Sequence, residues 1–328
     1  MNGREEYNYR LKIKNDKYIH DHPELRGFKN YLSDYSQTTV YNYLLIITRF
    51  NEYVKKPEQR LTIDDFSGYL NIMKFKENGE LRNNSNMITI YHALKNYASY
   101  LEAKGVLKNN PMEKVRRPKF SESQITIQKR ENAFLTSQEI TELLNNIKQG
   151  VGSSKAKSFQ EHLKERDIAI VLVFLSTGIR CSALCNLDVD SYDATNHRLI
   201  VTDKGDKTQF FSLNSITCDA INTWLHIRSR MIADTDNCNA LFISQKRKRM
   251  DQSTISYNLK KYTITIQGKH ITPHKLRATY GTQLYEATKD IYFVQKAMGH
   301  NSPTTTERYV RGQDEVTKEA SDIMGRLF

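Results

Sequence analysis

The sequence predicts two domains, an α-helical domain followed by a larger one that is mostly helical but contains a small antiparallel sheet. The chain has 328 residues, which is enough for two hydrophobic cores. Apolar residues recur twice at helical spacing in its first third, over residues 40–54 and 87–101. Further along, two apolar segments within residues 198–213 flank a short polar turn at 203–206, as in a β-hairpin. These observations place the helices first and the sheet in the second domain.

The chain divides into five expected segments. The N-terminal residues are polar and mixed in charge, which predicts a flexible arm or a first short helix, too short for a separate domain. From Val115 to Arg130 the chain is basic and lacks periodicity, which fits an interdomain linker or an ordinary solvated loop. The expected boundaries are an N-terminal arm at 1–22, a helical domain at 23–117, a linker at 118–132, a second domain at 133–312 and a C-terminal helix at 313–328.

Three helices are expected in the helical domain. The segments at 40–54 and 87–101 each carry one apolar stripe, and Gly105 stands where glycine commonly ends a helix. Thr62, which acidic residues follow, predicts the start of a third helix. Such stripes form a core more often than a binding site, so contacts to a ligand are expected from the polar faces.

The second domain opens with Thr136 or Ser137 as a helix cap. The apolar run at 168–175 is eight residues long and fits either a buried strand or a buried helix by periodicity alone. After the hairpin, another helix is expected around residues 221–231, which contain Trp224.

Composition favours a polyanionic partner. The formal net charge is +12, and a strongly basic chain attracts polyanions by electrostatic steering and counterion release. No signal peptide or membrane span is expected, because the longest apolar run has eight residues and a spanning helix needs about 20. The cysteines form no C-x-x-C pattern, so we expect reduced core thiols and a cytoplasmic location.

A group of residues near the end of the chain suits phosphate chemistry. Thr272 and Pro273 predict a helix start, with a capping residue followed by proline at the first helical position. His274 and Arg277 are three residues apart, so they lie on one face of that helix. Free backbone N–H groups in its first turn favour an anion.

Other polar residues complete the group. Arg180 follows the apolar run at 168–175, and a planar guanidinium binds phosphate with two donors. Lys204 lies in the turn of the expected hairpin, His300 follows a glycine, and Tyr309 lies further on. In this order, Arg180, Lys204, H-x-x-R at 274–277, G-H at 299–300 and Tyr309 resemble the tyrosine recombinases, which include phage and mobile-element integrases and the Xer enzymes.

The resemblance implies a fold and an activity. It implies a helical core-binding domain and a catalytic domain of tyrosine recombinase type, with residues 168–175 as a buried helix. The implied activity is site-specific recombination of double-stranded DNA at inverted-repeat core sites, through a 3′-phosphotyrosine intermediate and a Holliday junction. A type IB topoisomerase and a non-cleaving DNA-binding regulator remain alternatives, and integration by a mobile element is favoured over resolution of chromosome dimers.

The resemblance also implies roles for residues. Tyr309 would be the nucleophile, Lys204 the general acid, and the two arginines clamps on the phosphate, while the two histidines would bind the phosphate and assist proton transfer. No cofactor is implied, and Pro273 between His270 and His274 disfavours a metal site on a continuous helix. The implied catalytic set is Arg180, Lys204, His274, Arg277, His300 and Tyr309.

For a DNA-acting enzyme, basic runs and helix starts become candidate backbone contacts, although a charge run is often only a solvated face. The candidate DNA contacts are Asn83, Asn84, Arg116, Arg117, Lys119, Lys246, Arg247, Lys248, Arg249, Lys260 and Lys261.

Three points stay open. Lys207 shares the hairpin turn with Lys204, and only the resemblance favours Lys204. The family commonly has an acidic residue three positions after its first arginine, where this chain has Ala183, so Asp188 or Asp190 is considered as a substitute. Residues 313–328 carry one apolar helical stripe, which either folds back on its own domain or, as the resemblance implies, docks on a neighbouring protomer and links a homotetramer.

Overall fold

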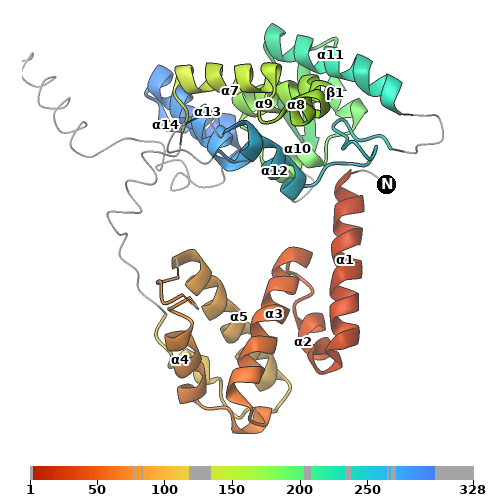
Figure 1. Ribbon diagram of the computed structural model, residues 1–328. Helices are drawn as coiled ribbons and strands as arrows, with labels where there is room; N and C mark the ends of the chain where they lie inside the picture. Colours follow the sequence, from red (N-terminus) through yellow and green to blue (C-terminus); the bar gives the residue numbers. More distant parts are fainter. Residues whose placement is uncertain are drawn as a thin grey trace, which may run out of the picture. The chain divides into compact units, whose positions relative to one another are not determined.

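The computed structural model describes residues 3–76, 78–82, 84–117, 134–202, 208–232, 238–263, 266 and 271–299 (Figure 1). Contacts between residues divide the chain into two compact units, Arg4–Glu122 and Ser123–Phe328, the second of which also takes Met1–Gly3. Each unit has a hydrophobic core of its own. The predicted fold class, a helical domain and a mostly helical domain with a small antiparallel sheet, is confirmed.

Helices and short 3₁₀ turns build the N-terminal unit. In chain order these are α1 (Gly3–Asp21), η1 (Pro23–Leu25), α2 (Arg26–Tyr31), α3 (Gln37–Val54), η2 (Glu58–Arg60), α4 (Ile63–Ile72), α5 (Asn84–Ala103) and η3 (Pro111–Glu113).

The N-terminal segment is a helix that belongs to this unit. Asn15 of α1 is fully buried, and its Nδ2 donates to the backbone oxygen of Gln37 at 3.0 Å and to its side-chain Oε1 at 2.7 Å. The hydroxyl groups of Tyr18 and Thr48 lie 2.7 Å apart. Of the two expectations for this segment, the helix is therefore the one that the structure shows over residues 3–21, and it packs on α3.

The predicted apolar stripes of α3 and α5 form the core of the N-terminal unit. Phe50 of α3 stacks on Phe66 of α4 with their ring centroids 4.9 Å apart. The predicted start at Thr62 is confirmed by a capping box, in which the backbone N–H of Thr62 donates to Asp65 Oδ2 at 2.9 Å. Gly105 has a φ of 74°, as expected of a residue that ends a helix.

The second unit combines helices with one sheet. Its elements are α7 (Ser137–Gln149), α8 (Ser154–Glu161), α9 (Lys164–Thr177), α10 (Cys181–Cys185), η4 (Val189–Ser191), β1 (Tyr192–Asp193), β2 (Arg198–Thr202), β3 (Thr208–Ser212), α11 (Ser215–Met231), α12 (Gln252–Tyr262), α13 (Pro273–Thr288) and α14 (Ile291–Met298).

The expected hairpin is present. Strands β2 and β3 pair antiparallel, with Leu199 opposite Phe211 and Val201 opposite Gln209, and the short strand β1 adds to the other edge of β2. Leu199 and Val201 are buried, so this face of the hairpin packs on the core. The residues that connect β2 to β3, 203–207, lie outside the described residues.

The apolar run at 168–175 is part of α9, which settles the choice between strand and helix. This helix packs against α7, α11 and α13 (Figure 1). Contact with three helices explains why the run lacks a polar face, because a helix surrounded by other elements is apolar all round. The helix expected around 221–231 is α11, whose Trp224 is buried and donates from Nε1 to the backbone oxygen of Leu241 at 2.8 Å.

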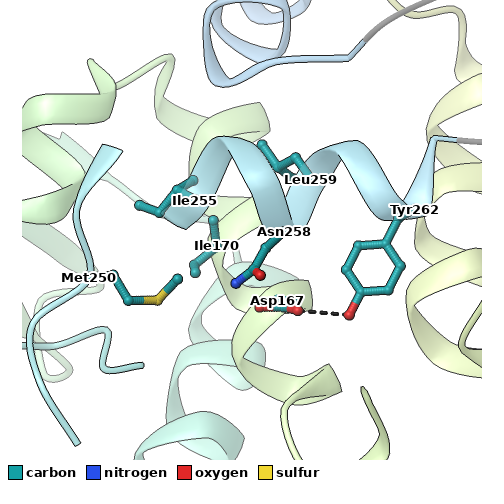
Figure 2. A pocket seen from close by; sticks show the side chains of 7 residues that line it. All are labelled: Asp167, Ile170, Met250, Ile255, Asn258, Leu259 and Tyr262. Carbon is teal, nitrogen blue, oxygen red and sulfur yellow. Dashed lines mark hydrogen bonds between the residues drawn. The ribbon is translucent and has the colours of Figure 1, made fainter. Parts of the chain in front are cut away.

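A buried polar network fixes the first turn of α9. The adjacent residues Arg166 and Asp167 form an ion pair with Nη2 and Oδ1 2.7 Å apart, although both side chains are almost inaccessible. Tyr262 at the end of α12 donates to Asp167 Oδ2 at 2.7 Å, as Figure 2 shows. Beside this bond lies a cavity of about 10 Å³ between α9 and α12, which is about the space of one water molecule. Burial raises the pKa of the Tyr262 hydroxyl well above its usual range, and the Asp167 carboxylate adds to the rise.

Two further expectations concern the cysteines and the membrane. Cys181, Cys185, Cys218 and Cys238 are free thiols, as expected. Within the described ranges, no helix combines the length and the apolarity that crossing a bilayer demands.

Candidate active site

The end of α9 places Arg180. Gly178 ends the helix in the left-handed conformation, with a φ of 59°, and its N–H donates to the backbone oxygen of Phe174 at 2.9 Å. This cap turns the chain out of the core. Arg180 follows two residues later as a half-buried residue at the start of α10. The structure thus shows the expected exit of this arginine from a buried segment.

The start of α13 places His274 and Arg277. Thr272 caps the helix by accepting a hydrogen bond from the backbone N–H of Lys275 at 3.3 Å, and Pro273 is the first helical residue, which confirms the predicted start. His274 in the first turn is exposed, whereas Arg277 is only 5% exposed. The two residues therefore differ in their surroundings, because His274 is exposed and Arg277 is buried in the protein.

Backbone oxygens at two helix ends hold the two guanidinium groups. Arg277 donates from Nη1 to the oxygen of Gly178 and from Nη2 to that of Met298, the latter at 2.8 Å. Arg180 donates from Nη2 to the oxygen of Gly299 at 3.4 Å. Both arginines therefore meet at the C-terminal end of α14, where Gly299 has a left-handed φ of 61°. A buried cation is tolerated when hydrogen bonds satisfy it, and these carbonyl oxygens supply such bonds.

Gly178 is required for a second reason, its contact with Tyr280. A Cβ atom at position 178 would lie 2.3 Å from Cδ1 of the Tyr280 ring, which is closer than any side chain tolerates. Tyr280 stands three residues after Arg277 on α13, so the same helix turn that carries Arg277 also packs on the end of α9. Burial raises the pKa of the Tyr280 hydroxyl, and the charge of Arg277 opposes that rise.

Gly178 and Gly299 were not identified from the sequence as part of the site. The signal was present, because each glycine directly follows a helical apolar segment, where a left-handed cap is common. What a sequence does not display is that the carbonyl groups at these caps accept hydrogen bonds from arginines 21 or more residues away.

Asp188 and Asp190, which were considered as substitutes for an acid at position 183, form contacts with other residues. Ala183 is buried in α10. Asp188 forms an ion pair with Arg249, and Asp190 accepts a hydrogen bond from Nδ2 of Asn239 at 3.2 Å. Neither of these two contacts involves Arg180 or Arg277.

Several predicted residues lie outside the described residues. These are Lys204, Lys207, His270, His300 and Tyr309 of the second unit, Asn83 and Lys119 of the DNA-contact set, and the expected C-terminal helix at 313–328. Of the catalytic set, the structure therefore brings together Arg180 and Arg277, with His274 one turn before Arg277. In the parts of the chain that the structure describes, no group of three or more His, Cys, Asp or Glu side chains is arranged to hold a metal ion.

The remaining DNA-contact candidates differ in exposure. In the N-terminal unit, Asn84 begins α5 and is half-buried. Arg116 and Arg117 are exposed, and they line an open groove together with Asn71 of α4 and Lys74, which follows this helix. In the second unit the exposed candidates are Lys246, Arg247, Lys248 and Lys260.

Two candidates serve the fold instead. The Arg249 side chain is only 9% exposed, pairs with Asp188, and donates from Nη1 to the backbone oxygens of Cys185 at 3.1 Å and Leu187 at 3.0 Å. Lys261 turns inward, with Nζ 3.5 Å from Asp167 Oδ2, and burial lowers its pKa although Asp167 opposes the shift. In the sequence, Arg249 and Lys261 look like ordinary members of basic runs. Only their tertiary contacts distinguish them from the exposed basic residues beside them.

The chain is similar to known proteins over this site. Residues 133–315 match the model of the phage integrase family. Tyrosine recombinase XerC of Alcanivorax borkumensis is 32% identical over 66% of this chain and 65% of the relative. XerC of Caldanaerobacter subterraneus is 32% identical over 70% of this chain and 59% of the relative, so these matches span less than two thirds of both relatives. XerC of Shewanella amazonensis is 29% identical over 87% of this chain and 90% of the relative.

Solved structures share the fold. XerH site-specific recombinase bound to difH substrate has a TM-score of 0.63 at 20% identity and covers 89% of this chain and 81% of its own. A dimer of lambda integrase residues 75–356 bound to a COC′ core site has a TM-score of 0.63 at 18% identity and covers 89% of this chain and 95% of its own. At these identities the likeness establishes the fold.

Proposed function

Because the chain belongs to the phage integrase family, we propose that the protein is a site-specific DNA recombinase. It cleaves and rejoins double-stranded DNA through a 3′-phosphotyrosine intermediate and exchanges strands through a Holliday junction. The observation that carries the proposal is the meeting of Arg180 and Arg277 at the C-terminal end of α14, next to the position of His300 in the chain.

In the proposed reaction, Arg180 and Arg277 bind the scissile phosphate. Two guanidinium groups neutralise the non-bridging oxygens and stabilise the charge that develops in the transition state, where loss of one such donor costs about 2.7–4 kcal/mol of barrier. Their carbonyl acceptors support this role, because they orient the two guanidinium groups in the folded protein. His274 is exposed beside them and completes the phosphate contacts together with His300.

Tyr309 is the proposed nucleophile. Its oxygen attacks phosphorus while its proton passes to a base, for which His274 or His300 is proposed. The bond to the 5′-oxygen breaks, and Lys204 gives the leaving oxygen a proton. A free tyrosine has a pKa of about 10, so the reaction depends on a strongly activated phosphate. The phosphotyrosine keeps the energy of the broken bond, and attack by a 5′-hydroxyl reverses the sequence.

DNA is the proposed partner of both domains. The net charge of +12 and the exposed basic residues support this, as do the structures of XerH bound to difH substrate and of lambda integrase bound to a COC′ core site. We assign residues 23–117, together with the helix α1 that packs on them, to core binding, 133–312 to catalysis and 118–132 to the linker. We further propose inverted-repeat core sites and a homotetramer linked by residues 313–328. A cytoplasmic location remains a prediction. The proposed backbone contacts are Asn83, Asn84, Arg116, Arg117, Lys119, Lys246, Arg247, Lys248 and Lys260.

Covalent trapping tests the proposal. A bound duplex site is first selected from a random-sequence pool, and a version nicked near the cleavage point traps the covalent adduct. The wild-type protein should form an adduct with the 3′ side of the break, and Tyr309→Phe should bind the duplex equally well and form none. An adduct that persists in Tyr309→Phe would move the nucleophile, with Tyr292 or Tyr280 as the next candidates. Relaxation of supercoiled DNA without site preference would favour a topoisomerase, and no wild-type adduct on its selected site would favour a non-cleaving regulator.

A further inference from the structure

The strand that leaves the hairpin turn touches the same helix end that holds Arg180. Gln209 is the second residue of β3 and is half-buried. A Cβ atom on Gly299 would lie 2.4 Å from Nε2, 2.9 Å from Oε1 and 3.1 Å from Cδ of Gln209. All three atoms belong to the carboxamide, and its two polar atoms lie nearer than Cδ, so the polar end of the Gln209 side chain occupies the space that a side chain at position 299 would need.

This contact joins two parts of the site that are far apart in sequence. On one side, the carbonyl oxygen of Gly299 accepts a hydrogen bond from Arg180, and Gly299 directly precedes His300 in the chain. On the other side, Gln209 pairs with Val201 across the hairpin, whose connecting residues include Lys204 and Lys207. The hairpin is thereby fixed, near its connection, against the residue that also orients Arg180.

Packing within the hairpin passes this restraint to both strands. Val201, the partner of Gln209, is buried, and Thr202 still pairs with Thr208, so the ladder is complete to the last described residues. A paired two-stranded ladder moves as a unit, so a side chain that holds one strand also sets where the other ends. The Gln209 contact therefore acts at the point where both strands enter the connection.

We infer that Gln209 is a positioning residue for the proposed reaction. By packing on Gly299, it fixes the position of the hairpin that carries Lys204 and Lys207 relative to Arg180. The inference rests on the proposed function, in that a lysine of residues 203–207 protonates the leaving 5′-oxygen. Gln209 itself acts through packing on Gly299, not through contact with the DNA. Loss of its side chain should then harm the protonation step and leave the phosphate clamp intact.

A substrate with sulfur at the 5′-bridging position isolates that step, because a thiolate leaves without a proton. Gln209→Ala should cleave the normal selected duplex more slowly by about 10-fold or more, a part of the 10²–10⁴-fold that general acids contribute. It should recover most of this loss on the sulfur substrate, with unchanged DNA affinity. Gln209→Met keeps the length of the side chain without its polar atoms and should cleave like wild type on both substrates. Ser212→Ala, an exposed position at the far end of β3, is the matched control.

The outcomes separate this inference from the assignment of the site. Lys204→Ala and Lys207→Ala identify the general acid by the same recovery, and Arg277→Ala should not recover. If one lysine variant recovers and Gln209→Ala does not, the inference fails and the proposed function stands. If Gln209→Met is as impaired as Gln209→Ala on both substrates, the carboxamide contacts the phosphate and positioning is wrong. If neither lysine variant recovers, the general-acid assignment fails and the inference falls with it.

Discussion

Arg180 and Arg277 donate hydrogen bonds to consecutive peptide groups, Arg180 to the oxygen of Gly299 at 3.4 Å and Arg277 to that of Met298 at 2.8 Å. Consecutive carbonyl oxygens of one rigid turn set the separation of the two guanidinium groups. A second bond from Arg277 to Gly178 ties this turn to the end of α9. The site therefore joins two left-handed helix caps, and the backbone conformation of these caps sets the positions of the carbonyl oxygens that both arginines bind.

Gly178→Ala should impair both folding and cleavage. The left-handed conformation costs a side chain about 1–2 kcal/mol, and the new Cβ would also collide with the Tyr280 ring. Gly152→Ala is the matched control, because Gly152 has a φ of 90° but its Cβ would lie 3.6 Å from the nearest atom, an ordinary contact. Urea unfolding should show a larger loss of stability for Gly178→Ala, and only this variant should lose adduct formation. Equal losses of stability in the two variants would show that the Tyr280 contact is not restrictive.

Tyr262→Phe should lower the free energy of unfolding by about 1–3 kcal/mol, the usual cost of leaving a buried charged group short of one hydrogen bond. The hydroxyl of Tyr262 donates to Asp167 Oδ2, while Arg166 holds the other oxygen. Tyr257→Phe on the same helix is the control, since Tyr257 is 73% exposed. Thermal or urea unfolding measures the difference. A Tyr262→Phe protein as stable as Tyr257→Phe would show that water replaces the hydroxyl at Asp167 at no cost.

Lys246→Ala and Arg249→Ala should separate a DNA contact from a structural residue within one basic run. Lys246 is exposed, so its loss should weaken binding of the selected duplex and reduce the slope of log affinity against log salt by about 1, without a change in stability. Arg249 is held by Asp188 and two backbone oxygens, so its loss should lower the melting temperature instead. An unchanged salt slope in Lys246→Ala would remove this run from the DNA interface.

Truncation after Gly312 should leave binding of a single half-site intact and abolish cooperative binding and synapsis. The removed residues carry one apolar helical stripe, at Val316, Ala320, Ile323, Met324, Leu327 and Phe328, which needs a surface to cover it. Mobility shifts on half-sites and full sites measure the two properties separately. A truncated protein that unfolds would place the stripe on its own domain, and one that recombines normally would leave it without a role in assembly.

Local patterns in the sequence predicted the elements that local physics determines. The stripes of α3 and α5, the helix start at Thr62, the hairpin and the Thr272–Pro273 helix start all depend on neighbours a few residues apart. The run at 168–175 was ambiguous because a helix buried on all sides has no polar face to reveal its period.

Tertiary contacts explain what the sequence could not predict. Lys246 and Arg249 are alike as members of a basic run, and only the position of Asp188 commits Arg249 to the fold. At Ala183 the sequence indicated a missing acid, and Asp188 or Asp190 was considered in its place. The structure shows peptide oxygens that accept hydrogen bonds from both arginines, and because any residue type supplies a peptide oxygen, the sequence does not reveal these contacts.

Support from main-chain oxygens also determines which substitutions the Arg180–Arg277 arrangement tolerates. A single substitution removes a carboxylate that orients an arginine. A peptide carbonyl group is retained in every substitution that leaves the backbone conformation unchanged. Met298 should therefore accept other apolar residues of similar volume, and position 183 is free to drift with the packing of α10. The fragile codons are those of Gly178 and Gly299, where any side chain would meet Tyr280 or Gln209. In a saturation library selected for recombination, depletion should peak at these two glycines among the residues that support the arginine pair.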